Sequence, residues 1–272
     1  MNKPDRPHLL IPMPDVQSAP DDRRIAIDRV GIKGLRYPLL FADGDGRGQP
    51  TIATCNIYVS LPEDRKGTHM SRLVALLETR TEPAAPPLTI EGVRALLEDL
   101  VVLLEAPAGR IEMAFPFFVR KSAPISGVSS RLDYDVNVEA ELVAGEYRHV
   151  ITVSVPVTSL CPSSKEISEY GAHNQRSMIV ITAQPRAPID LIELIRVAEE
   201  EASCELFGLL KRADEKYVTE YAYNNPRFVE DLVRGVAARL MAEPRVAGFA
   251  VEAENFESIH NHSAYARIAR GL

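Results

Sequence analysis

The sequence predicts an α+β fold built from two similar modules in tandem, each combining antiparallel strands with a pair of helices. Three observations lead to this prediction. Segments of alternating hydrophobicity are interleaved with segments of helical periodicity, the clearest strand has one apolar and one polar face, and the order of elements occurs twice. We therefore expect a flexible N-terminal arm over residues 1–24, a first module over 25–143 and a second over 144–272.

The first module is expected to contain two strands, two helices and two further strands, over 30–39, 51–59, 70–77, 93–104, 111–119 and 132–142. Thr89 precedes the second helix and is the predicted N-cap, because its hydroxyl can accept a hydrogen bond from a free backbone N–H. In the last strand, apolar residues alternate with acids and one Asn. One face of this strand is therefore buried and the other faces water, as in an antiparallel sheet.

A hairpin at Gly145 leads into the second module, which repeats the pattern. Pro188 is expected to open its first helix, and Asn225-Pro226 to start the second in the favoured order of cap then proline. Its strands are expected over 150–157, 178–183 and 246–253.

Composition limits the classes of function. The 272 residues include 46% hydrophobic ones, enough for a real core. The net charge of -7 argues against a nucleic-acid partner, because phosphate-backbone binders carry a basic surface. A single charged nucleotide is still compatible, since a local basic pocket can form on an acidic protein.

The sequence also argues against secretion and membrane insertion. Residues 9–13 are too short for a signal-peptide core, and no stretch reaches the roughly 18 apolar residues that a membrane span needs. Cys55, Cys161 and Cys204 are an odd, sparse set for a secreted protein. We expect a soluble, cytoplasmic protein with free thiols or one metal-bound thiol.

The segment 159–177 is the best candidate for chemistry, because it lies between two predicted strands. Cys161 and His173 suit a divalent metal such as Zn²⁺ or Fe²⁺, but the eleven residues between them match no standard zinc-finger spacing. A buried Cys and a helix-capping His are the alternative interpretation.

Two further groups could serve catalysis or phosphate binding. His260 and His262 point the same way if they lie on a strand, as ligands or proton carriers would; solvated histidines near a frayed C-terminus are the alternative. Lys66, His69 and Arg72 surround a predicted helix start that could hold a phosphate, or they belong to an ordinary capped helix.

Two acids complete the candidate set. Glu215 lies in a polar stretch over 211–216, and Glu230 lies in the first turn of the helix predicted after Asn225-Pro226. Acids in a first turn commonly do no more than complement the helix dipole.

Five collinear blocks give these motifs a common meaning. The blocks are VGIKGLRYP (30–38), KGTHMSR (66–72), CPSSKEIS (161–168), YGAHNQR (170–176) and NPRFVED (225–231). Together they resemble the type IB GTP cyclohydrolase I family, from about residue 30 to the C-terminal histidines. The resemblance implies a tunnelling fold (T-fold), in which sheets from several subunits join into barrels, and a homotetramer with sites at subunit interfaces.

The resemblance also implies an activity and a site. The activity is hydrolysis of GTP to 7,8-dihydroneopterin triphosphate and formate, at the entry to tetrahydrofolate biosynthesis. The implied ligands of one divalent metal (Zn, Fe or Mn) fall on Cys161, His173 and Glu215, and the purine anchor falls on Glu230. We assign proton transfer to His260 and His262, and the triphosphate to Lys66, His69, Arg72 and Arg176.

One position departs from the family pattern. Many relatives read Cys-Pro-Cys-Ser-Lys where this chain has Ser163 in place of the second Cys, which removes any second thiolate from the loop. Two alternatives stay open: a T-fold protein that binds a purine or pterin with other chemistry, such as nitrile reduction, and a binding oligomer without catalysis.

Overall fold

The computed structural model describes residues 15–44, 46–82 and 85–272. These residues form nine strands and six helices: β1 (Ile27–Phe41), β2 (Gln49–Leu61), α1 (Met70–Glu78), α2 (Ile90–Leu103), β3 (Ala108–Ser122), β4 (Ser129–Val143), β5 (Glu146–Leu160), α3 (Pro162–Ile167), β6 (Asn174–Pro185), α4 (Leu191–Glu201), β7 (Cys204–Glu205), α5 (Arg212–Asn224), α6 (Val229–Ala242), β8 (Val246–Asn255) and β9 (Ala264–Arg270).

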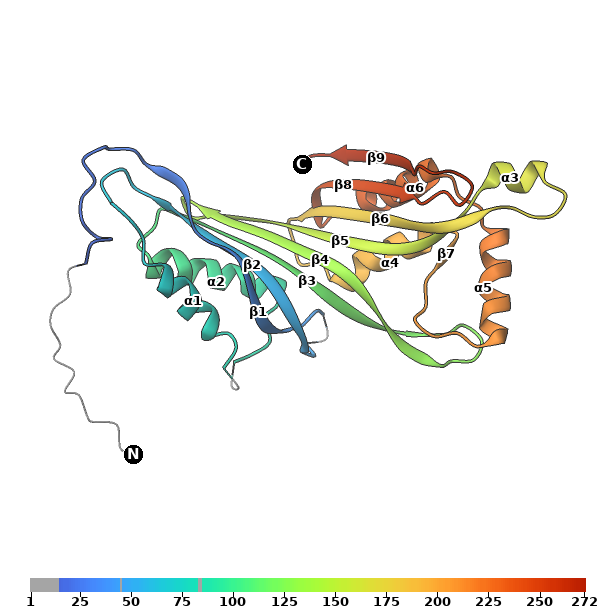
Figure 1. Ribbon diagram of the computed structural model, residues 1–272, viewed down its shortest axis with the longest axis horizontal. Helices are drawn as coiled ribbons and strands as arrows, with labels where there is room; N and C mark the ends of the chain where they lie inside the picture. The colour runs from blue at the N-terminus through green and yellow to red at the C-terminus, as the bar shows by residue number, and fades with distance from the viewer. Residues whose placement is uncertain (1–14, 45, 83–84) are drawn as a thin grey trace, which may run out of the picture.

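One antiparallel sheet runs through the whole molecule. Its strand order is β1-β2-β3-β4-β5-β6-β8-β9, with the short β7 paired beside β5. The molecule is elongated, with α1 and α2 towards one end and α3 and α5 at the other (Figure 1). The predicted α+β class with antiparallel strands and paired helices is confirmed. Within the described ranges, no helix is long and apolar enough to span a membrane.

All the packed helices cover the same face of this sheet. Ile57 on β2 pairs with Ile111 on β3, and Val138 on β4 pairs with Ile151 on β5, and all four side chains are fully buried. The opposite face is polar: Arg110 on β3 forms ion pairs with glutamates on β3 and β4. This one-sided burial is the alternation that the sequence showed over 132–142.

The helices divide between the two halves of the sheet. Helices α1 and α2 contact β1, β3 and β4, whereas α4 and α6 contact β5, β6, β8 and β9. The two halves of the sheet meet at the β4–β5 hairpin. The two turn residues, Ala144 and Gly145, both have positive φ, as a two-residue turn of type I′ requires. The division into modules at 143/144 stays a prediction, because the strands of both halves belong to one sheet.

The segment from residue 15 to β1 runs beside the segment after β2. Backbone hydrogen bonds join Gln17, Ala19 and Asp21 to residues 64–67. These contacts involve the part of the predicted arm from residue 15 onwards, and residues 1–14 lie outside the described ranges.

Two expected helix starts are placed differently by the structure. Thr89 caps α2 as predicted, its Oγ1 accepting from the Gly92 N–H at 3.0 Å. Helix α4, however, starts at Leu191 rather than at Pro188, and α6 starts at Val229 rather than at Asn225-Pro226. Asn225 instead ends α5, a helix that the polar stretch over 211–216 did not reveal. Its apolar periodicity is weak, because Ala222 is its one buried apolar side chain.

A carboxylate from the first half caps a helix of the second half. Asp43, between β1 and β2, accepts the backbone N–H groups of Leu191 and Ile192 at 2.9 and 3.1 Å. Asp190, the N-cap residue itself, makes no side-chain cap bond. Burial raises the pKa of Asp43 to about 6, against the two hydrogen bonds, and the charges of Asp190 and Glu91 add to the rise.

Asp43 should therefore make stability depend on pH. Between pH about 4 and about 6 the folded protein holds a proton on Asp43 that the unfolded chain has lost, so the free energy of unfolding falls as pH rises through this window. We expect Asp43→Asn to remove that slope, measured by urea unfolding from pH 4 to 7. The exposed Asp22→Asn is the control; parallel curves for wild type and Asp43→Asn would contradict the assignment.

Candidate active site

The pairing of β5 with β6 brings Cys161 and His173 together. The ladder ends with Leu160 opposite Asn174, so the two candidate ligands stand at the next position beyond it. The Cys161 N–H donates to the His173 carbonyl at 3.1 Å, which closes the loop between them. The residue spacing that matched no zinc-finger pattern is therefore the length of a loop joining two paired strands.

Ser164 fixes the geometry of this loop. Its hydroxyl donates to the Cys161 carbonyl at 3.2 Å and accepts the His173 N–H at 3.2 Å. Its own N–H donates to Cys161 Sγ at 3.4 Å, which fixes the position of the sulfur. Cys161 is half-buried, whereas Cys55 and Cys204 are buried, and all three are free thiols. Cys161 is thus the accessible thiol of the three.

The ring of His173 is held through one nitrogen. Nδ1 lies 3.0 Å from Gln175 Oε1, and Glu257 Oε2 lies 3.7 Å from the same nitrogen. With Nδ1 engaged on the protein side, Nε2 remains to bind a metal or a proton. This is the usual arrangement around metal-ligating histidines.

The connection between β8 and β9 lies against His173. The Phe256 N–H donates to the Arg176 carbonyl at 3.1 Å, so this loop starts beside β6, the strand that directly follows His173. His260 and His262 lie in this loop and not on a strand, which corrects the prediction. Their rings are nonetheless stacked, with centroids 4.9 Å apart, and β9 orders the chain after them.

Glu230 belongs to the same end of the sheet. It lies in the first turn of α6, where its side chain is exposed. The Arg227 N–H donates to the Leu160 carbonyl at 3.0 Å, so the approach to α6 is attached to the residue before Cys161. Backbone contacts thus bring four parts of the predicted site to one end of the sheet. They are the Cys161–His173 pair, Arg176, the loop with His260 and His262, and the start of α6.

Glu215, by contrast, does not join Cys161 and His173 in a ligand cluster. It lies near the start of α5, whereas α3 contacts the far end of that helix, where Lys165 Nζ donates to the Tyr223 carbonyl. Eight residues of helix correspond to a separation of about 12 Å. Among the described residues, no three His, Cys, Asp or Glu side chains converge to hold a metal.

The start of α5 is itself rigidly placed. Asp214, fully buried, accepts hydrogen bonds from the backbone of Ile125, Ser126 and Lys211 and from the Ser126 hydroxyl. Burial opposes its ionisation, but these hydrogen bonds prevail and hold the pKa of Asp214 below its usual range. They join α5 to the β3–β4 turn and so determine where Glu215 stands.

The donor chemistry of the Cys161–His173 pair fits a divalent metal. A half-buried thiol that accepts an N–H, together with an imidazole oriented through its other nitrogen, is a borderline-soft ligand pair suited to Zn²⁺ or Fe²⁺. These residues supply two positions, and a third protein ligand must come from elsewhere. Because residue 163 is Ser, Cys161 is the one cysteine of this loop.

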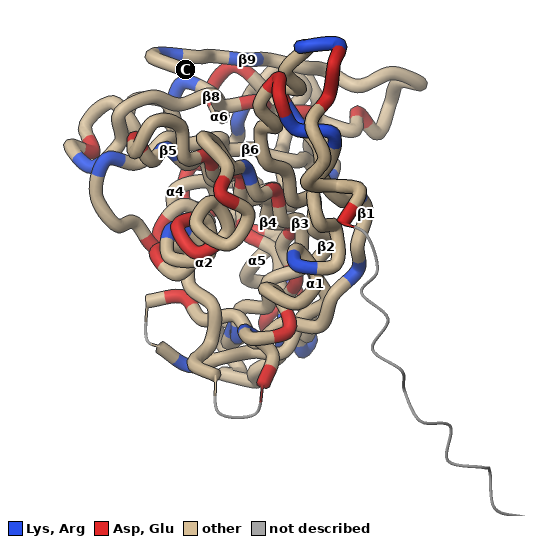
Figure 2. The backbone as a smooth tube through the Cα atoms, turned by 90° about the vertical axis from the view of Figure 1, so that its left-hand side faces the viewer, with Lys and Arg blue, Asp and Glu red and all other residues tan. Residues whose placement is uncertain are grey.

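The predicted phosphate ligands are divided between the two ends of the molecule. His69 and Arg72 line a cavity of about 250 Å³ beside α1, and Lys66 precedes that helix. His69 Nε2 is 3.4 Å from Asp15, and Arg72 donates to the Leu103 carbonyl. Acidic and basic residues are interspersed over this end (Figure 2). Only Arg176 stands with Cys161, because α1 and α3 lie at opposite ends (Figure 1).

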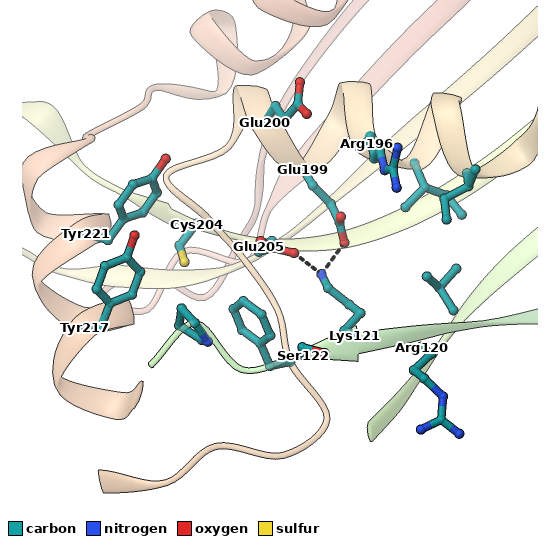
Figure 3. Close-up of a pocket in the computed structure, with 15 residues that line it drawn as sticks. Arg120, Lys121, Ser122, Arg196, Glu199, Glu200, Cys204, Glu205, Tyr217 and Tyr221 are labelled. Atoms are coloured by element: carbon teal, nitrogen blue, oxygen red, sulfur yellow. Dashed lines mark hydrogen bonds and ion pairs between the residues drawn. The ribbon is translucent and has the colours of Figure 1, made fainter. Parts of the chain in front are cut away.

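A cavity of about 420 Å³ lies between β3, α4 and α5, and none of the predicted site residues lines it. Lys121 bridges Glu199 and Glu205 at its centre, and Tyr217 and Tyr221 stand along one side (Figure 3). Tyr134 donates to Glu199, and burial, followed by this carboxylate, raises the pKa of Tyr134. The charges at the centre of this cavity, those of Lys121, Glu199 and Glu205, neutralise one another. Because Lys121 lies on β3 and Glu199 on α4, these ion pairs join a helix to the sheet.

Sequence reasoning missed several residues of the site. Ser164, Gln175 and Glu257 all contact Cys161 or His173 but were not singled out. A signal existed for Gln175: it is a polar residue at a position that continues the buried face of β6. Glu257 had none, because it reaches His173 from a loop more than eighty residues further along the chain.

Comparisons with known proteins agree on one family. A family model described as Type I GTP cyclohydrolase folE2 matches residues 13–266. GTP cyclohydrolase FolE2 of Burkholderia ambifaria is 60% identical over 258 residues, covering 95% of this chain and 94% of the relative. The protein of the same name from Paraburkholderia xenovorans is 58% identical, with 95% of each chain covered. Among solved structures, uricase from Arthrobacter globiformis shares the fold alone, with a TM-score of 0.50, 8% identity, and 90% and 93% coverage.

Proposed function

The chain belongs to the type I GTP cyclohydrolase folE2 family, and from that membership we propose that it converts GTP and water to 7,8-dihydroneopterin triphosphate and formate. The observation that carries the proposal is the Cys161–His173 pair, which the β5–β6 ladder holds at one end of the sheet. The alternatives, other purine or pterin chemistry or binding without catalysis, are not favoured by this membership.

The reaction needs a nucleophile at C8 of guanine and several proton transfers. Cys161 and His173 would hold a divalent metal, which when bound would supply the Lewis acidity that makes water nucleophilic at neutral pH. His260 and His262, exposed and stacked in the loop that also carries Glu257, are suited to carry protons during ring opening and formate loss. Ser164 and Gln175 keep the ligands in place while these steps proceed.

We propose that Glu230 recognises guanine. Guanine presents N1–H and an exocyclic amine side by side, and one carboxylate can accept both. Adenine lacks this pair of donors and would leave the carboxylate unpaired. Glu230 lies in the first turn of α6, beside the positive end of the helix dipole, which is a favourable place for an acidic side chain.

The complete site is proposed to form between copies of the chain. Three features support this: α1 and α3 lie at opposite ends, β1 and β9 are sheet edges, and large apolar side chains are exposed around Cys161. The apolar side chains are those of Ile167, Tyr170, Phe228, Phe256 and Ile259. Association through these surfaces, as in a T-fold tetramer, would bring Lys66, His69 and Arg72 of one copy to Cys161 of another. We propose Glu215 as the third metal ligand of the assembled site.

The direct test is incubation of the metal-loaded protein with GTP, followed by assays for formate and for fluorescent oxidised neopterin. We expect both products from the wild type in equal amounts. Cys161→Ala should lose bound metal and both products while keeping its melting temperature, because the residue lies in a surface loop. Absence of both products from metal-loaded wild type would refute the proposed reaction.

Glu230→Gln tests base recognition. The amide is the same size but turns one acceptor into a donor that opposes the hydrogens of guanine. We expect kcat/KM for GTP to fall about 100-fold or more, with metal content and melting temperature nearly unchanged. Asp231→Asn, in the same helical turn, is the control for stability. Asp231 caps α6 by accepting the Phe228 N–H, so this variant shows what weakening the start of α6 does by itself to turnover. Near-normal turnover by Glu230→Gln would mean that another group recognises the base.

Mixing two inactive variants tests the shared site. Suppose that Cys161 and Arg72 of one site come from different copies. A site with both native residues then forms wherever an Arg72→Ser chain supplies Cys161 and a neighbouring Cys161→Ala chain supplies Arg72. Co-refolding equal amounts should restore activity to about a quarter of the wild-type value. No gain over the separate variants would place both residues of each site on one chain.

A further inference from the structure

The buried face of the sheet changes from apolar to polar beside His173. Val157 on β5 and Ile179 on β6 are fully buried. The following positions on the same face, towards the site, carry polar side chains that are at most 8% exposed: Ser159, Gln175, Ser177 and Asn255. Because a buried polar group is costly unless it is hydrogen bonded, these four residues need partners there.

The four residues satisfy one another in a single chain of hydrogen bonds that ends on His173. The Ser177 hydroxyl donates to Asn255 Oδ1 at 2.7 Å and lies 2.7 Å from the Ser159 hydroxyl. Gln175 Nε2 donates to Ser159 Oγ at 2.8 Å, and Gln175 Oε1 lies 3.0 Å from His173 Nδ1. We call Asn255, Ser177, Ser159 and Gln175 the polar chain.

The polar chain has a direction. Each serine hydroxyl donates one proton, so donation to Asn255 by Ser177 requires Ser159 to donate to Ser177 and to accept from Gln175. Gln175 then presents only its carbonyl oxygen to His173, and Nδ1 must carry the hydrogen. Reversing every bond would leave Nδ1 as an acceptor facing the Gln175 amide nitrogen.

Glu257 selects between these two directions. Its Oε2 lies 3.7 Å from His173 Nδ1, beyond hydrogen-bond distance but close enough to favour a hydrogen on that nitrogen. An ionised carboxylate can only accept. Glu257 therefore opposes the reversed arrangement, and two independent groups agree on an Nδ1–H tautomer.

We propose that Gln175 is a positioning residue that, through the polar chain, holds His173 as the Nδ1–H tautomer and so directs the Nε2 lone pair towards the ligand position. The tautomer follows from the hydrogen bonds alone. That the ligand is the metal rests on the proposed function. Gln175 touches neither substrate nor metal and acts only through the imidazole.

The test reads the tautomer directly in metal-free protein, by ¹⁵N NMR of the histidine rings. Gln175→Met keeps the length of the side chain but removes both hydrogen bonds. We expect the predominantly Nδ1–H ring of wild type to become a mixture in this variant, and its dissociation constant for Zn²⁺ to rise about 10–100-fold by chelator competition. Ser177→Ala, which leaves Gln175 in place but breaks the polar chain two links away, should shift both measurements in the same direction by less.

Thr182→Val is the matched control. The Thr182 hydroxyl lies 3.1 Å from the Thr152 hydroxyl, between the same two strands but on the opposite face of the sheet. The variant therefore removes a comparable hydrogen bond between β5 and β6 and leaves the polar chain intact. We expect wild-type tautomer and Zn²⁺ affinity from it. An unchanged tautomer in Gln175→Met, or in Ser177→Ala if the first variant does not fold, would overturn the proposal. Unchanged Zn²⁺ affinity in Cys161→Ala would instead refute the proposed metal site, because the tautomer is measured without metal.

Discussion

The pairing register of β5 with β6 is the constraint on which the candidate site depends. Because Leu160 stands opposite Asn174, Cys161 and His173 meet at the first position beyond the ladder, and Ser159 stands beside Gln175. A slip of one residue would move every side chain of one strand to the other face of the sheet. The apolar residues earlier in both strands prevent such a slip, since it would expose Val153, Val155, Val157 and their partners. The same core packing that stabilises the sheet therefore sets the geometry of the two ligands.

The site occupies the place where this core ends. Towards the middle of the sheet the buried face is Val, Ile and Ala, and its stabilisation comes from apolar burial. At the last positions Ser159, Ser177, Gln175 and Asn255 replace such residues, at a cost that their mutual hydrogen bonds offset. A polar network of this kind is stable only when each member is satisfied, which makes its geometry unique. That uniqueness is what an imidazole needs if one particular nitrogen is to face a ligand.

An acidic chain must also accommodate an anionic substrate. The net charge of -7 disfavours a triphosphate over most of the surface, so the cations that offset it have to be gathered locally. In one copy they are not gathered: Lys66, His69 and Arg72 lie beside α1, and Arg176 lies near His173. The exposed apolar side chains around Cys161 and the open edges of β1 and β9 are features that association of copies would cover. Assembly would then bury apolar surface and gather charge in one step.

The sequence by itself determined the fold class, the family and most of the secondary structure, because strand alternation, helical periodicity and collinear motifs are local properties of the chain. It identified Cys161, His173 and Glu230, which converge at one end of the sheet. It did not reveal α5, whose apolar face is narrow, or the loop that carries His260 and His262, whose i, i+2 spacing resembled a strand. Only the tertiary structure decided that Gln175 and Glu257 face His173, that Asp43 caps α4 and that Glu215 stands apart from the Cys–His pair. Each of these depends on contacts between segments distant in sequence, or on how a loop closes, and no local pattern encodes such contacts.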